Sequence, residues 1–125
     1  MRALPRLSLV LLLAVAGCKT TAVAPEGALN GTWVWTNTTT LEGKSLQLTS
    51  SGSSVTGTGQ DLDAQHQVIG SYTISGTYKN AEINLSMSYQ DGSSATFSGH
   101  CVGTDTVQGT WTGPNGGQIT LVRAN

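Results

Sequence analysis

Apolar and polar residues alternate with a period of two along most of this chain. Residues 29–36 set the pattern: the odd positions hold Leu, Gly, Trp and Trp, and most even positions hold Asn or Thr. Successive side chains of a β-strand point to opposite faces, so the pattern predicts a strand with one buried and one solvated face. None of the later segments has a helical period. The alternation predicts eight strands, at residues 29–40, 44–50, 53–60, 68–78, 81–89, 93–101, 105–112 and 117–123.

The turns between these segments test which face points inward, because residues directly opposite in a hairpin share a face. The expected loops are Ser51-Gly52 and Lys79-Asn80, with two residues each, and Gln90-Asp91-Gly92 and Pro114-Asn115-Gly116, with three. In the longer loops the final glycine is expected in the left-handed conformation. The first loop places Leu48 opposite Val55, both inward. Each loop keeps the apolar residues on one face, and all seven aromatic residues lie on it.

A sheet with one apolar face has to be covered or closed on itself. The sequence offers no helix to cover it, so we predict an all-β fold: an eight-stranded antiparallel up-and-down (meander) barrel with the apolar residues inside. An outer-membrane barrel would have the opposite arrangement, apolar outside and polar within. The inward face also carries many glycines, which we expect to let the sheet bend or to let large rings lie over them.

The first seventeen residues have the organisation of a secretory signal peptide. Arg2 and Arg6 give a positively charged start, and residues 7–16 form an apolar run too short to span a bilayer. The run ends in Val15-Ala16-Gly17-Cys18, which resembles the lipobox of bacterial lipoproteins. The alternative is an inert cysteine in an ordinary signal peptide. We divide the chain into a signal peptide (1–17), a lipidated cysteine with a flexible tether (18–28) and a barrel domain (29–125).

The lipobox resemblance implies cleavage before Cys18, a diacylglyceryl thioether on its sulfur and an acylated amino group, with chains such as palmitate as the membrane anchor. Cleavage leaves four basic residues against seven acidic ones, a net charge of 4 − 7 = −3. This charge gives no reason to expect nucleic acid as a partner. Lys19 follows the cysteine where enterobacterial sorting to the inner membrane uses Asp. We therefore expect a monomer in the bacterial cell envelope, anchored at the outer membrane.

Gly31 and Trp33 on the first predicted strand, with Arg123 at the end of the last, resemble the signature of the calycins, which include lipocalins, fatty-acid-binding proteins and avidins. In those families a first-strand Gly-x-Trp and a last-strand Arg pack together at the closed end of the barrel. The resemblance covers the topology of residues 29–123 and implies a barrel-closing role for the three residues. It also implies an Arg123 guanidinium within about 6 Å of the Trp33 ring. The lipocalin Thr-Asp-Tyr motif, the C-terminal helix and the polar inward residues of a biotin site are missing.

The opposite end of such a barrel would hold any mouth. We expect the mouth to be framed by Asp61, Asp63, His66, Asp91 and Asn115. Eight strands leave an interior just wide enough to be filled by side chains or to hold one small ligand. We expect a filled lower half with a shallow pocket above it.

No group of residues predicts catalysis, so we expect no enzymatic activity, no cofactor and no metal site. Asp61, Asp63 and His66 share one predicted loop, but their spacing matches no known cation-binding loop. His100 is expected at the surface. Cys101 points inward and is the only cysteine left once Cys18 is lipidated, so a buried thiol without an intrachain disulfide is expected.

Two non-enzymatic functions remain open at this point. The first is a lipid-anchored barrel that binds a small apolar ligand. The second is a filled barrel that contacts a protein partner in the envelope, as an interaction module or in the manner of periplasmic protease inhibitors.

Overall fold

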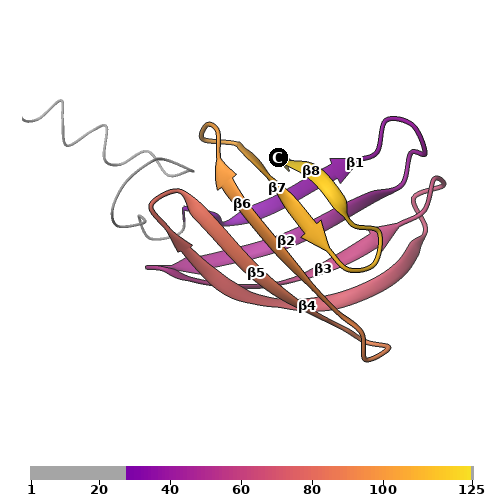
Figure 1. Cartoon of the computed structure of the whole chain (residues 1–125), viewed down its shortest axis with the longest axis horizontal. Helices are drawn as coiled ribbons and strands as arrows, with labels where there is room; N and C mark the ends of the chain where they lie inside the picture. The colour runs from indigo at the N-terminus through magenta and orange to yellow at the C-terminus, as the bar shows by residue number, and fades with distance from the viewer. Residues whose placement is uncertain (1–27, 125) are drawn as a thin grey trace, which may run out of the picture.

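The computed structural model describes residues 28–124 of the chain. These residues form eight antiparallel strands in which each pairs with the next and the last pairs with the first, closing a barrel (Figure 1). The predicted all-β meander barrel is confirmed. The signal peptide and Cys18 lie outside the described residues. The strands are β1 (Gly31–Thr36), β2 (Gly43–Ser51), β3 (Ser54–Leu62), β4 (Val68–Lys79), β5 (Glu82–Tyr89), β6 (Ser94–Cys101), β7 (Thr106–Thr112) and β8 (Gly117–Ala124).

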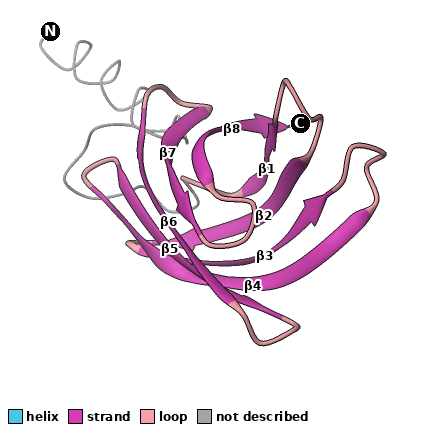
Figure 2. Ribbon diagram, turned by 45° about the vertical axis from the view of Figure 1, so that its right-hand side comes forward, coloured by secondary structure: helices cyan, strands magenta, loops and turns pink. Residues whose placement is uncertain are grey.

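The strands curl around one interior, and the turns gather at two ends (Figure 2). The turns at 52–53, 80–81 and 102–105 lie at the end where the described chain begins, which we call the closed end. The loops at 37–42, 63–67, 90–93 and 113–116 lie at the other end, which we call the open end. This is the arrangement that a meander of eight strands requires.

The predicted inward face is the buried face. β5 shows the pattern clearly, because its eight residues alternate strictly between exposed and buried. Buried aromatic and aliphatic side chains from all eight strands or their flanks make one core, with Trp33, Trp111, Tyr78 and Phe97 among its largest members. The outward face consists largely of Ser and Thr. The apolar-inside arrangement expected from the alternation is therefore present.

The hairpin between β2 and β3 turns one residue later than predicted. Ser51 pairs with Ser54, so the loop is Gly52-Ser53 and not Ser51-Gly52. Gly52 has a φ of 60°, which suits the first central position of a two-residue hairpin loop. Leu48 therefore lies opposite Gly57 and not Val55. The register changes by two residues, so every side chain keeps its predicted face.

The hairpin between β4 and β5 is displaced in the same way. Lys79 pairs with Glu82, so the loop is Asn80-Ala81 and not Lys79-Asn80. Both loop residues have positive φ, 55° at Asn80 and 66° at Ala81. A type I′ turn needs positive φ at both central positions, and Asn tolerates it better than the Lys that the prediction placed there.

Of the two three-residue loops predicted at the open end, the first is confirmed and the second is corrected. The Gln90-Asp91-Gly92 loop has the expected form: Tyr89 N–H donates to the Ser93 carbonyl at 2.9 Å, and Gly92 has a φ of 94°. The later loop has four residues, 113–116, and not three, because β7 ends at Thr112 and β8 begins at Gly117. Its left-handed residue is Asn115, with a φ of 54°, and Gly116 has no positive φ. Gly116 is needed for space instead, because a Cβ there would run into the carbonyl oxygens of Trp111 and Gly113.

Several inward glycines lie beneath large rings, as expected. A Cβ at Gly59 would collide with the Tyr72 ring, and one at Gly99 or Gly109 would collide with Phe97. Glycine at these positions leaves room for the Tyr72 and Phe97 rings inside the barrel. The interior is filled in this way.

Candidate functional site

The closed end is built around one arginine. The Arg123 guanidinium carbon lies 4.4 Å from the centroid of the Trp33 ring, so the contact predicted from the sequence is present. Trp33 in turn donates its indole N–H to the Leu29 carbonyl at 2.9 Å. A cation against an aromatic face is favourable, and partial burial strengthens it. A Cβ on Gly31, where φ is 128°, would lie 3.5 Å from Arg123 Nη1.

Arg123 also ties together three segments that meet at this end. Its guanidinium donates to the carbonyls of Asn30 at 2.5 Å and Ala28 at 3.1 Å, before β1, and to the Thr104 carbonyl at 3.2 Å. Its Nε donates to the Asp105 carboxylate at 2.8 Å. One side chain thus joins the ends of β8 and β1 to the β6–β7 loop.

A buried ion pair lies inside the barrel toward the open end. Lys44 on β2 and Asp61 on β3 are direct cross-strand neighbours. Lys44 Nζ lies 2.9 Å from Asp61 Oδ1, and the two side chains are 0% and 2% exposed. The same Nζ lies 3.8 Å from the centroid of a Trp111 ring. The ammonium is held between a carboxylate and an aromatic face, both of which attract a cation.

Neutral donors complete the coordination of the Asp61 carboxylate. Tyr89 donates its phenol to Oδ2 at 2.7 Å, and Asn115 donates its amide to the same oxygen at 3.4 Å. Tyr72 donates to Oδ1 at 3.5 Å, and its ring packs on that of Tyr89 with centroids 4.7 Å apart. A buried charge is tolerated only when paired and hydrogen-bonded, and Asp61 meets both conditions. The arrangement forms a polar plug of Lys44, Asp61, Tyr72 and Tyr89 beneath the open end.

The plug shifts the pKa values of its members. Burial raises the pKa of Tyr72 and of Tyr89 above the usual 10.0, and the Asp61 charge and hydrogen bonds add to this. Burial lowers the pKa of Lys44 below 10.5, and Asp61 opposes that shift. Both phenols therefore remain protonated donors to Asp61 through the physiological range.

These directions fix the sign of the alkaline response. Above a pH of about 10 the unfolded chain loses phenol protons that the folded chain keeps, so the two tyrosines make stability fall as pH rises. Lys44 acts in the opposite sense between its lowered folded pKa and 10.5, where the unfolded chain binds the extra proton. Above that range Lys44 adds no further change and the tyrosines dominate.

One buried polar atom near the plug has no hydrogen-bond partner among the described residues. This atom is the indole nitrogen of Trp111. It is close enough to the Tyr89 phenol to lower the pKa of that group slightly, against the larger opposing causes. The geometry falls short of a hydrogen bond, so the ring serves mainly as the face that covers Lys44.

A small cavity lies over the plug at the open end. Its volume is about 280 Å³, and its lining includes Asp61, Tyr89, Asp91 and Asn115. Ligand pockets usually have volumes of roughly 300–1,000 Å³ and mainly apolar walls. This cavity is small and carries carboxylates, so it corresponds to a shallow polar pocket and not to a deep lipid site.

Only some of the five residues expected at the mouth line this cavity. Asp61, Asp91 and Asn115 come together at the cavity, but Asp63 and His66 do not line it. Asp63 accepts hydrogen bonds from the backbone N–H groups of Gln65 and Gln67, which shapes the β3–β4 loop. Among the described residues, no group of three His, Cys, Asp or Glu side chains is placed to hold a metal ion.

The plug was not predicted, because Lys44 was expected at the start of a strand and Asp61 in a loop. The signal was present in the alternation. Two steps back from Leu46 gives Lys44, and two steps on from Gly59 gives Asp61, both in the inward phase. Opposite charges that enter one interior from neighbouring strands predict an ion pair.

Cys101 points inward as expected, but it is disulfide-bonded in the structure and not a buried thiol. That prediction is corrected. The chain's other cysteine, Cys18, lies outside the described residues. The lipoprotein hypothesis requires that the Cys18 sulfur carry a lipid thioether and no disulfide, which intact-mass measurement of the mature protein tests.

The chain matches no protein-family model, no curated protein and no solved structure. The likeness to calycins therefore rests on the eight-stranded topology and on the Trp33–Arg123 contact. The part of the chain that the structure describes contains no helix that could cross a bilayer.

Proposed function

We propose that this protein is a non-enzymatic lipoprotein of the bacterial cell envelope whose barrel acts by contact with a protein partner, and not by carrying an apolar ligand in its interior. The observation that supports this is the polar plug. An apolar ligand entering from the open end would have to separate Lys44 from Asp61. Breaking a buried ion pair costs roughly 3–5 kcal/mol, and the ligand would offer neither charge a substitute.

The proposed cellular location follows from the resemblance of Val15-Ala16-Gly17-Cys18 to a lipobox. Lipid chains on Cys18 would hold the protein on the membrane, at the outer membrane by the sorting argument, as a monomer. Ala28 is buried at the closed end of the barrel, so the tether is residues 19–27, which reach at most about 30–32 Å when extended. A domain at the end of such a tether can meet envelope proteins while its closed end faces the lipid.

A second candidate function has one observation in its favour. The cavity of about 280 Å³ at the open end has room for a small molecule. Its acidic and hydroxyl lining would suit a small polar compound, so this candidate differs from the apolar carrier that the sequence left open. No catalytic role is proposed for the cavity, because Asp61 is already fully engaged by its neighbours.

Native mass spectrometry tests the proposal. The protein is purified from its own host in detergent, delipidated and sprayed under non-denaturing conditions. The protein-contact function predicts the mass of the bare chain. A stoichiometric hydrophobic adduct would overturn it in favour of a carrier, and a stoichiometric polar adduct would favour the second candidate.

A further inference from the structure

The ladder that closes the barrel between β1 and β8 is short. Among the described residues its pairs are Thr32–Ala124, Trp33–Arg123 and Val34–Val122, whereas every other neighbouring strand pair has at least six. Continued in the same register, Thr36 would pair with Thr120, but the ladder ends at Val34. The seam between β1 and β8 is therefore joined toward the closed end and parted toward the open end.

The parted strands direct backbone hydrogen-bonding groups into the seam. Arg123 N–H donates to the Asp105 carbonyl, on the β7 side of β8. Alternate residues of a strand point their N–H and C=O groups to opposite sides, so Gln118 and Thr120 point theirs toward β1. At those positions β1 provides no pairing residue. By the same alternation Thr36 presents its backbone groups to the seam from the β1 side.

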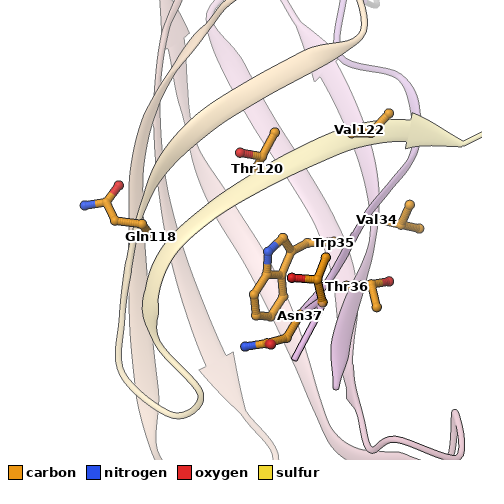
Figure 3. Close-up of a pocket in the computed structure, with 8 residues that line it drawn as sticks. Val34, Trp35, Thr36, Asn37, Gln118, Thr120 and Val122 are labelled. Atoms are coloured by element: carbon orange, nitrogen blue, oxygen red, sulfur yellow. The ribbon is translucent and has the colours of Figure 1, made fainter. Parts of the chain in front are cut away.

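A groove of about 570 Å³ follows this seam on the outside of the barrel, lined by Val34, Trp35, Thr36, Gln118, Thr120 and Val122 among others. Figure 3 shows the Trp35 ring in the opening between the two ribbons. Trp35 is only partly buried, whereas the other two tryptophans are 1% exposed. Proteins usually protect free strand edges with charged residues or proline, and none of the residues lining this groove is either.

We propose that the seam binds an extended, uncharged peptide segment of a partner protein, which pairs with the free edge of β8 at Gln118 and Thr120 and covers Trp35. This rests on the proposed protein-contact function and gives that contact a location. Addition of a strand to a free edge is a common mode of peptide recognition, in which backbone hydrogen bonds provide affinity. The unpaired groups and the uncharged, β-branched lining are the features that such a segment would satisfy.

A second copy of this chain fits the seam less well. The free edge of β8 from Gln118 to Leu121 spans only about 14 Å at ~3.4 Å per residue. A stable dimer buries roughly 1,200 Å² or more, which an edge of this length does not supply. A single extended segment makes all its contacts within that length, and the joined pair Val34–Val122 marks where it stops.

The probe is a displayed library of random linear peptides of about ten residues, selected on the mature, full-length protein held in detergent. The most enriched peptide is synthesised, and binding is followed by protection of tryptophan fluorescence from acrylamide, which reads Trp35 because the other tryptophans are buried. We expect uncharged, β-branched sequences. N-methylation of alternate residues should abolish binding, and N-methylation of the residues between them should not.

Two substitutions at one position separate backbone pairing from side-chain contact. Thr120→Pro removes the N–H that faces the seam without removing a bond to β7, and edge strands tolerate proline. We expect it to weaken binding about tenfold, and the matched control Thr120→Val to change binding less than about twofold. Melting curves and circular dichroism show whether both variants fold. The N-methylated peptides test the same pairing without altering the protein.

Three results would overturn the proposal. They are the enrichment of no binding peptide, equal binding by Thr120→Pro and by Thr120→Val, and a dimer in sedimentation that Thr120→Pro dissociates, which would identify a second copy as the occupant. Failure of the seam proposal can be distinguished from failure of the proposed protein-contact function. A bare chain in native mass spectrometry with no peptide at the seam would reject the seam alone, whereas a bound small molecule would reject protein contact as the function.

Discussion

Removal of the Lys44 charge is the most informative perturbation of the barrel interior. In Lys44→Met the side chain is one atom shorter and wholly apolar, so Asp61, which is 2% exposed, loses the charged partner that lies 2.9 Å away. The phenols of Tyr72 and Tyr89 still donate to it, so its desolvation is only partly offset. Loss of one partner of a buried pair costs roughly 3–5 kcal/mol. Domains of this size have about 5–15 kcal/mol of stability in total, so the effect is large.

Thermal and urea unfolding followed by circular dichroism give the free energy of unfolding. For a domain of about 100 residues, each kcal/mol lowers Tm by roughly 4–8 °C, so we expect Lys44→Met to lower Tm by at least ~12 °C. Lys79→Met is the matched control, because Lys79 is exposed at the end of β4 and the same substitution there should change stability by less than about 0.5 kcal/mol.

A double-mutant cycle isolates the ion pair itself. Asp61→Asn leaves Lys44 without an anion, and we expect a loss similar to that of Lys44→Met. The double variant should be more stable than the sum of the single losses predicts, by about 1.5 kcal/mol or more, because the second substitution removes an already unpaired charge. If Lys44→Met were no more destabilising than Lys79→Met, Lys44 would reach solvent in solution and the plug would not exist.

Three further outcomes follow from particular residues. Gly92→Ala should cost about 1 kcal/mol because its φ is 94°, and Gly116→Ala about 1–3 kcal/mol because its Cβ would meet the Trp111 carbonyl; urea melts check both, and a neutral Gly116→Ala would contradict the loop geometry. Urea melts between pH ~9 and ~12 should show stability falling above pH ~10.5, less steeply in Tyr89→Phe, since that variant removes a phenol whose pKa is raised on folding. Cys18→Ser should leave unprocessed or mislocalised precursor, and intact-mass measurement of the mature protein should find lipid on Cys18; a lipid-free Cys18 in a disulfide would end the lipoprotein proposal.

The architecture was predictable because its determinants are local and repeated. A period of two over every strand defines the two faces, and the absence of a covering helix requires closure. Hairpin positions were less predictable, since the shift from Ser51 to Gly52 depends on which residue accepts positive φ at the first loop position. Asn115 and Gly116 are adjacent, and both residue types tolerate positive φ, so the sequence did not show which of them adopts it. The Trp111 carbonyl lies close to Gly116, and no local pattern reveals that contact.

The site was less predictable than the fold. The Arg123–Trp33 contact followed from a resemblance, but the plug followed only from extending the alternation through charged residues, against the expectation that Lys and Asp lie at the surface. The parted seam could not be predicted. The alternation of β1 and β8 is the same whether or not their edges meet, so it carries no signal for where their pairing ends.

The buried side chains of the core and the polar plug occupy the interior of the barrel. A diffraction structure of the protein purified from its own host tests this most directly. We expect continuous density from Asp61 to Lys44 beneath the Trp111 ring, with the phenols of Tyr72 and Tyr89 on the carboxylate. Unassigned density among those rings, with Lys44 and Asp61 separated, would contradict it.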